Sequence, residues 1–275
     1  MKNLFTLKDK VIVVTGAAGL LGFEYCKAIA NAKGTPILID INEKLLKSKV
    51  EELKDEFPKC ICESYVVDIT KEEQIKKNCS VIIAKYWKID GLINNAANNP
   101  KIEDNDFINF SRLENFNVDI WKNDLNIGLL GAFLCIKYYG FAISKNSLGG
   151  SIINVSSDLG VIAPNQNLYK KEGVSEDLQS VKPVTYSVIK HGINGLTKYV
   201  STYWADKNIR CNSICPGGVF NKQPEDFLNK VSKLIPLGRM AKKEELNGII
   251  IYLLSDASSY VNGSIINIDG GRTSW

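Results

Sequence analysis

Seven short apolar runs recur along this 275-residue chain, separated by longer segments with the residue pattern of helices. Runs that are apolar on both faces and alternate with helices indicate parallel strands covered on each side. The pattern therefore predicts an α/β fold, a doubly wound parallel sheet of about seven strands with helices on both faces. The runs are residues 10–15, 36–40, 64–68, 91–95, 150–155, 209–214 and 264–268.

The length and composition are those of one large globular domain. Hydrophobic residues make up 45% of the chain and charged residues 23%, both ordinary values for a globular protein. No internal repeat or Pro/Gly-rich linker divides the sequence, so we predict a single domain over residues 1–275. Two polar stretches, near residues 98–119 and 164–183, interrupt the alternation. Insertions of this kind often shape a substrate site.

Charge and cysteine usage exclude several classes of partner. The formal charge of +4 arises from 34 basic and 30 acidic residues that are interspersed, which argues against nucleic acid. The seven cysteines include no C-x-x-C spacing and indicate reduced thiols in a cytoplasmic protein, with no metal site. The N-terminus has no apolar signal core, and we find no apolar run of 18 residues. We therefore expect a soluble protein with no membrane segment.

A glycine-rich turn follows the first apolar run and opens a helical segment that continues through residues 23–30. Glycines at these positions permit a tight turn, the approach of a pyrophosphate and close helix–strand packing, while the helix N-terminus favours negative charge. We therefore predict a Rossmann-type dinucleotide site. Its expected contacts in this turn are Gly16, Ala18, Gly19, Leu20, Leu21 and Gly22.

An acidic residue, Asp40, ends the second run, 18 residues beyond Gly22. A carboxylate there can accept hydrogen bonds from the adenosine ribose hydroxyls and would repel a 2′-phosphate. The next residue is Ile41 and no arginine follows, so we predict NAD as the cofactor, with NADP less favoured. The alternative is that Asp40 only caps the following helix.

Polar and small residues follow the third and fourth runs. Parallel strands place their ligands at their carboxyl ends, so we expect cofactor contacts from Asp68 and Ile69 and from Asn95, Ala96 and Ala97. For the neighbouring Asn94, a structural role in the turn is an equally good interpretation.

Tyr186 and Lys190 are four residues apart in a helical segment, with Ser157 29 residues upstream of the tyrosine. Residues at this spacing share a helix face, and a nearby ammonium lowers the pKa of a phenol toward the range of a general base. Ser157 can hold the oxygen of an alcohol or carbonyl beside it. The alternative is a half-buried aromatic residue beside a solvated lysine.

The order of these motifs resembles that of the short-chain dehydrogenase/reductase family over almost the whole chain. The resemblance is carried by the glycine turn, Asp40, Asp68, residues 94–97, 124–126 and 153–157, Tyr186 with Lys190, residues 216–219 and residues 267–271.

The resemblance implies a catalytic set. Tyr186 would be the acid/base, Ser157 the anchor of the substrate oxygen, and Lys190 the residue that binds the nicotinamide ribose. Asn126 would hold a water that links the lysine to solvent. Further cofactor contacts, partly to the carboxamide, are implied for Pro216, Gly217, Val219 and Asn221, although a threonine is more usual at the last position.

The chain combines features of the short and extended forms of the family. The interval from Ser157 to Tyr186 is longer than in the short form, and Pro183 just before the tyrosine resembles extended members. The glycine spacing resembles the extended form that acts on nucleotide sugars, whereas the end at Trp275 is that of short members. Residues 94–97, 98–117, 157–166 and the Gly-Gly-Arg-Thr-Ser-Trp ending resemble bacterial oxidoreductases of flagellin and surface-glycan modification.

The implied reaction is NAD-dependent hydride transfer with a secondary alcohol or ketone on a small molecule: a sugar, sugar phosphate or nucleotide sugar. Lys170, Lys171, Lys182 and Arg239 could meet a phosphate or be merely solvated. One alternative is a nucleotide-sugar epimerase or dehydratase that retains its NAD, and another is a non-catalytic NAD-binding regulator. The resemblance also implies a homodimer or homotetramer, with residues 128–139 and 193–204 as interface candidates.

Overall fold

A seven-stranded sheet forms the centre of the computed structural model, which describes residues 4–98 and 111–275. The strand order is β3-β2-β1-β4-β5-β6-β7, and every neighbouring pair is parallel. This confirms the predicted doubly wound, Rossmann-type sheet. The strands are β1 (Val11–Thr15), β2 (Thr35–Asp40), β3 (Glu63–Val66), β4 (Gly91–Asn94), β5 (Gly150–Val155), β6 (Ile209–Pro216) and β7 (Ile265–Ile268).

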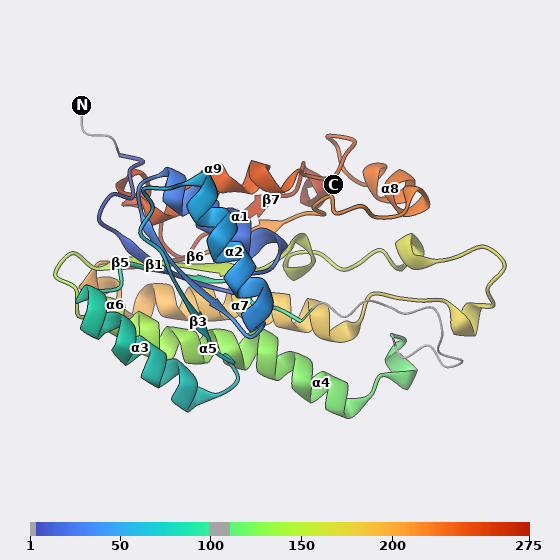
Figure 1. The fold of residues 1–275 in the computed structure, drawn as a ribbon. Helices are drawn as coiled ribbons and strands as arrows, with labels where there is room; N and C mark the ends of the chain where they lie inside the picture. The colour runs from blue at the N-terminus through green and yellow to red at the C-terminus, as the bar shows by residue number, and fades with distance from the viewer. Residues whose placement is uncertain (1–3, 99–110) are drawn as a thin grey trace.

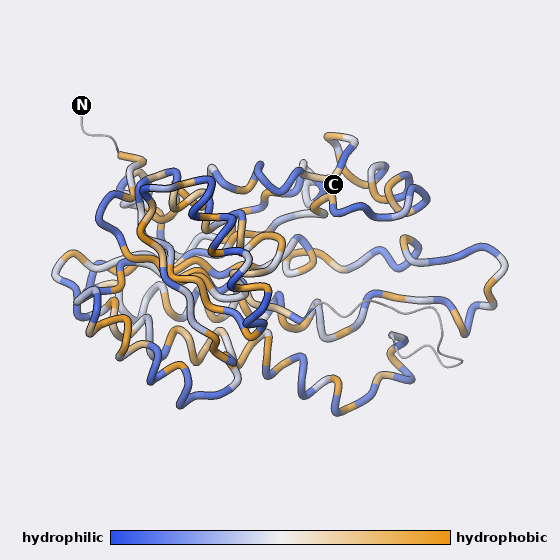
Figure 2. Tube along the Cα trace, viewed as in Figure 1, coloured by the Kyte–Doolittle hydropathy of each residue, from blue (hydrophilic) through white to orange (hydrophobic). Residues whose placement is uncertain are grey.

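Helices cover both faces of the sheet (Figure 1). Val11 and Val13 of β1 belong to one buried apolar cluster, while Ile12 and Val14 belong to the other. Each β1 residue is therefore buried whichever way it points, which explains the continuous apolar run. The edge strands β3 and β7 are only partly buried. Figure 2 shows hydrophobic residues concentrated along these strands.

The helices divide between the two faces. One cluster joins the sheet to α1 (Leu20–Asn31), α2 (Glu43–Glu56) and α9 (Asn247–Leu254). The other cluster joins it to α3 (Glu72–Tyr86), α7 (Val184–Tyr203) and a long helix over residues 118–143. That long helix comprises α4 (Val118–Leu125), the π-helical η2 (Asn126–Leu130), α5 (Gly131–Cys135), the π-helical η3 (Ile136–Gly140) and α6 (Phe141–Ile143).

The long helix was not singled out as an apolar segment from the sequence. Val118–Ile143 has 26 residues and a mean hydropathy of 1.4, so by length and composition it could cross a membrane. Half of its apolar window is buried, and Leu134, Ile136 and Tyr139 pack in the apolar cluster under the sheet. It is a core helix of a soluble fold.

The insertion at 164–183 lies beyond the carboxyl ends of the strands (Figure 1). It contains two short helical turns, η5 (Gln166–Tyr169) and η6 (Glu176–Leu178), and is largely hydrophilic (Figure 2). Leu168 anchors it by packing with Val231 of α8 (Glu225–Ser232). Of the other predicted insertion, near 98–119, residues 99–110 lie outside the described part, and the remainder includes η1 (Leu113–Asn115).

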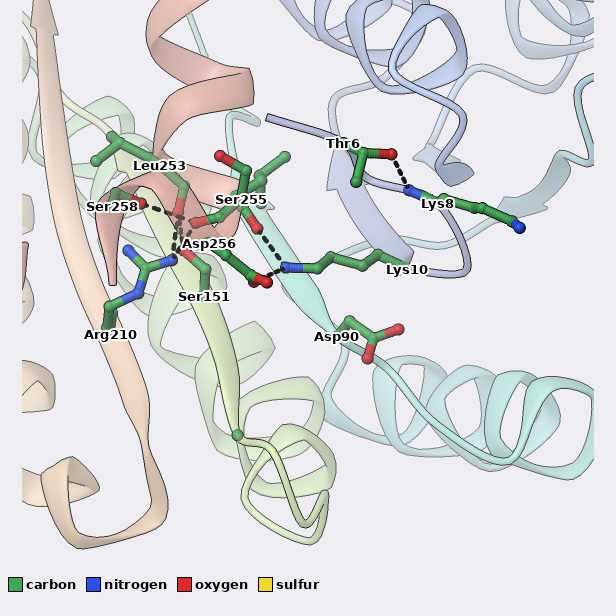
Figure 3. Close-up of polar contacts among 12 residues, drawn as sticks. Thr6, Lys8, Lys10, Asp90, Ser151, Arg210, Leu253, Ser255, Asp256 and Ser258 are labelled. Atoms are coloured by element: carbon green, nitrogen blue, oxygen red, sulfur yellow. Dashed lines mark hydrogen bonds and ion pairs between the residues drawn. The ribbon is translucent and has the colours of Figure 1, made fainter. Parts of the chain in front are cut away.

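The amino edge of the sheet binds the end of α9 (Figure 3). Arg210 donates from one guanidinium nitrogen to the carbonyls of Leu253 (2.8 Å) and Ser255 (3.3 Å). Lys10 donates to the carbonyl of Leu254 (3.1 Å), and the Ser151 hydroxyl donates to Leu253 (2.7 Å). The last carbonyls of a helix have no partner within it and favour nearby cations. These side chains therefore fasten α9 to β5, to β6 and to the residue that precedes β1.

We predict that Arg210→Met lowers the free energy of unfolding by about 1–3 kcal/mol, because buried helix-end carbonyls lose their donor. Urea denaturation measures the change. Lys8→Met is the matched control, since the exposed Lys8 side chain points away from the cluster in Figure 3. Equal stability of the two variants would contradict this role for Arg210.

Candidate active site

The glycine turn between β1 and α1 permits only glycine at two positions. Gly16 has φ of +63°, and a Cβ on it would lie 2.8 Å from Ala96 Cα. A Cβ on Gly22 would lie 2.1 Å from the Gly16 carbonyl oxygen. Gly19 is the N-cap of α1 and supplies no side chain to its first N–H groups. This open helix start suits a pyrophosphate.

Asn95 holds the glycine turn in place. Its amide nitrogen donates to the carbonyls of Thr15 (3.0 Å) and Gly16 (3.2 Å). The Thr15 hydroxyl in return accepts from the backbone N–H groups of Asn95 and Ala96, each at 3.1 Å. The Asn95 side chain is thus engaged within the protein, a supporting role where a direct cofactor contact was expected. Ala97 is exposed and lines the cavity described below.

Asp40 links the end of β2 to the same turn. One carboxylate oxygen accepts from the Ala18 N–H (3.0 Å) and the other from the Asn42 N–H (3.0 Å). Asn42, which accepts from Leu45 N, is the cap of α2, so helix capping does not explain Asp40. Ile41 is 66% exposed beside it. These positions leave a ribose site at the end of β2 as the better interpretation.

The remaining cofactor candidates lie near the carboxyl ends of the strands with differing exposure. The Asp68 carboxylate accepts from the Thr70 N–H and hydroxyl, at 2.9 and 2.7 Å. Ile69 is buried in the core, whereas Leu20 is exposed and Leu21 partly buried. Pro216, the last residue of β6, is buried, and the next residue, Gly217, donates its N–H to the Ile268 carbonyl. Val219 forms a β-bridge with Ala241, and Asn221 is exposed.

Ser157, Tyr186 and Lys190 come together between β5 and the start of α7. Ser157 follows β5 and donates its hydroxyl hydrogen to Asp158 Oδ1 (2.7 Å). Tyr186 and Lys190 both line a cavity, and the Lys190 Nζ lies 5.7 Å from the Tyr186 ring centroid. Lys190 Nζ donates to the Val155 carbonyl at 2.8 Å. These contacts tie the reactive helix to the end of β5.

Burial sets the protonation of this group. Burial raises the pKa of Tyr186. A hydrogen bond between Tyr186 and Ser157 acts to lower this pKa, and the negative charge of Asp158 acts to raise it. Burial also lowers the pKa of Lys190 to about 8. We expected the Lys190 ammonium to lower the pKa of the tyrosine, but here it points to a carbonyl and burial has the larger effect.

The structure does not bring Asn126 to the catalytic group, which corrects the prediction. Its side chain is exposed and outside the cavity. Asp124 and Gly128, one helical turn apart, both line the cavity, and a Cβ on Gly128 would lie 2.7 Å from Ile189 Cγ2. Two residues along a helix rotate a side chain by about 200°, so Asn126 points away from α7.

Asp124 is a buried site residue that reading the sequence missed. Its two carboxylate oxygens accept from the Asn98 amide (2.8 Å) and the Thr185 hydroxyl (2.7 Å). The i, i+4 spacing of Asp124 and Gly128 was the available signal. The cavity is lined by Ala97, Asn98, Asp124, Gly128, Tyr169, Lys182, Pro183, Thr185, Tyr186, Ile189 and Lys190.

A buried ion pair braces Ser157 from the C-terminal segment. Arg272 NH1 lies 3.0 Å from Asp158 Oδ2, and both side chains are less than a tenth exposed. Asp158 Oδ1 accepts from the Ser157 hydroxyl and from Leu159 N. The Arg-Thr-Ser-Trp ending thereby fixes the serine that faces the tyrosine.

We predict that Arg272→Met lowers the free energy of unfolding by about 3–5 kcal/mol, because it leaves the Asp158 carboxylate buried without its cation. Adding Asp158→Asn should recover part of that loss. Urea denaturation checks both variants. Arg239→Met is the control, since its ion pair with Glu245 is exposed. A loss for Arg272→Met no larger than for the control would refute the bracing role.

The sequence matches two family models that together span the described site. Residues 10–171 match the model described as short chain dehydrogenase, and residues 174–273 match the one described as Enoyl-(Acyl carrier protein) reductase. The chain belongs to the short-chain dehydrogenase/reductase family, enzymes that act on CH–OH groups with NAD or NADP.

Sequence similarity to individual relatives covers nearly the full length of this chain and of those proteins. Post-translational flagellin modification protein A of Campylobacter coli is 36% identical over 96% of this chain and 98% of that protein. The 3-oxoacyl-[acyl-carrier-protein] reductase of Thermotoga maritima is 32% identical over 96% and 98%. The crystal structure of a short-chain type dehydrogenase/reductase from Mycobacterium marinum superimposes with a TM-score of 0.83, at 26% identity and 98% coverage of each chain.

Proposed function

We propose that this enzyme transfers hydride between NAD and a secondary alcohol or ketone of a sugar-derived substrate. The observation that carries the proposal is the meeting of Ser157, Tyr186 and Lys190 after the carboxyl end of β5. Open α/β sheets bind their ligands at this end of their strands.

The glycine turn and Asp40 fit NAD. The space that Gly16 and Gly22 leave and the uncapped start of α1 suit the pyrophosphate, and the Asp40 carboxylate suits unphosphorylated ribose hydroxyls. When bound, NAD accepts or delivers the hydride.

Tyr186 and Ser157 handle the substrate oxygen. In oxidation, the O–H bond of the alcohol breaks and its proton passes to the Tyr186 oxygen, which accepts it as the phenolate, while the carbinol carbon gives up hydride to the cofactor and becomes a carbonyl carbon. The raised pKa of the phenol favours the reverse direction, in which Tyr186 is the proton donor. The Ser157 hydroxyl holds the reacting oxygen, and Lys190 supplies a buried positive charge behind the tyrosine. In reduction, Tyr186 returns the proton.

Asp158 favours this reaction over dehydration. Its carboxylate oxygens are engaged by Ser157, Leu159 and Arg272, which is the arrangement of a residue that positions its neighbour. A dehydratase would need a free acid at this place. Simple oxidoreduction is therefore the better supported reaction.

A role in flagellin or surface-glycan modification is supported by the Campylobacter coli relative, whose name states that process. The polar groups of Asn98, Asp124 and Thr185 along the cavity suit a hydroxylated substrate. The Thermotoga maritima relative is named for a different substrate, so the sugar assignment rests on the first relative and on these polar groups.

We also propose a cytoplasmic homodimer or homotetramer. Phe133, Tyr199 and Tyr203 are 46%, 64% and 60% exposed, and the two tyrosine rings stack with centroids 5.7 Å apart. These residues lie within the segments 128–139 and 193–204 that were expected to pair. Exposed aromatic residues of this kind are typical of interfaces.

We predict that Tyr186→Phe lowers kcat by about 100- to 10,000-fold, the usual contribution of a positioned acid/base. Turnover is followed by NADH absorbance. NAD binding, measured by calorimetry, should be unchanged. Tyr169→Phe is a matched control, because Tyr169 lines the same cavity and burial raises its pKa to about 12. Near-normal turnover by Tyr186→Phe would reject the mechanism.

We predict that Asp40→Ser raises the KM for NAD by about 10- to 100-fold, because the ribose hydroxyls lose their hydrogen bonds to a carboxylate. The same change should lower the KM for NADP, because the carboxylate no longer repels the 2′-phosphate. Side-by-side kinetics with both cofactors measure the ratio. Glu43→Gln, which changes an exposed acid three residues on, should leave the ratio unchanged. A wild-type preference for NADP would overturn the role of Asp40.

A further inference from the structure

The Lys182 side chain enters the cavity directly over the catalytic tyrosine. Its Nζ lies 3.8 Å from the Tyr186 ring centroid, and the side chain is partly buried among the cavity-lining residues. Within residues 4–98 and 111–275, the ammonium group makes no hydrogen bond or ion pair. Buried ammonium groups in proteins are almost always paired with an acceptor.

Two of the other basic residues that the sequence offered as phosphate contacts already have acidic partners. Lys170 pairs with Glu176 at 2.9 Å, and Arg239 pairs with Glu245 at 2.6 Å. Both pairs lie at the surface. Lys182 differs in being held inside the cavity, where burial lowers its pKa to about 8 and the Asp158 charge acts in the opposite direction. Among the described residues, the Lys182 ammonium group has no hydrogen-bonded or ion-paired carboxylate, and the Asp124 carboxylate that lines the same cavity is engaged by Asn98 and Thr185.

The polar insertion fixes the position of this lysine. The backbone N–H of Lys182 donates to Gln166 Oε1 (2.8 Å), and that of Val181 donates to the Ser111 hydroxyl (3.0 Å). Pro183 then begins α7 without a side-chain cap. The lysine backbone is thus held from both sides, and its ammonium group is set against the ring of Tyr186.

We propose that Lys182 binds an anionic group, a carboxylate or phosphate, of the same substrate whose oxygen Ser157 and Tyr186 hold. The inference rests on the proposed oxidoreductase function and names its substrate class as acidic. Because the ammonium group rests on the ring that carries the reactive hydroxyl, one small substrate can reach both groups. Lys182 is then a specificity-determining residue.

Three six-carbon polyols that differ in charge test this inference: D-glucitol, D-gluconate and D-glucitol 6-phosphate. The NAD-loaded wild-type enzyme should bind one or both anions at least about tenfold more tightly than neutral D-glucitol, since hydrogen bonds to charged groups contribute that much. The comparison of gluconate with the phosphate identifies which anion fits. Calorimetry measures binding, and NADH absorbance measures turnover.

Lys182→Met should weaken binding of the preferred anion, and raise its KM, by about 10- to 100-fold. The change in kcat should be under about threefold, and D-glucitol should bind as before. Lys182→Arg should restore most of the affinity, because arginine keeps the charge. Lys170→Met is the surface control and should match the wild type.

Two results would overturn the inference. One is equal binding of the anions to the wild type and to Lys182→Met. The other is a fall in kcat for every compound with a shifted pKa in the kcat–pH profile, which would assign Lys182 to tuning Tyr186. If the wild type binds an anion through Lys182 but reduces no NAD, the anion site stands and the proposed reaction is the part that fails.

Discussion

The tie between the ends of β1 and β4 is the contact on which the site depends. The strand order reverses at this pair, so the chain leaves β1 toward one face of the sheet and leaves β4 toward the other. The Asn95 amide and the Thr15 hydroxyl bond the two strand ends together. Gly16 can approach Ala96 only because it has no side chain. The glycine turn follows β1 at this junction, and the segment that follows β4 leads to Ala97, which lines the catalytic cavity.

The order of strands and helices was predictable from the sequence because buried strands leave continuous apolar runs. The central strands are buried on both faces, so their apolar runs are visible in the sequence whichever way a residue points. The positive φ of Gly16 and the contact of Gly22 with the Gly16 carbonyl are set within one short turn. Ser157, Tyr186 and Lys190 were found because α7 and the end of β5 fix them locally. The spacing of residues along the chain was sufficient to predict these features.

Features that depend on distant contacts were not predictable in the same way. Asn126 was assigned a role by family resemblance, and the sequence does not show that Asp124 lies on the face of the long helix that meets α7. The direction of the Lys190 ammonium depends on a carbonyl of β5. Arg272 reaches Asp158 across more than one hundred residues. Each of these required the packed structure.

The fastening of α9 by Arg210 and Lys10 lies at the amino edge of the sheet, and the chemistry lies at the carboxyl edge. A strand of five or six residues separates the two. Substitutions that stabilise the fold at the amino edge of the sheet can therefore accumulate without changing the shape of the cavity. This gives the fold room to compensate for destabilising changes in the 164–183 insertion, so new substrate preferences can be explored on an unchanged frame.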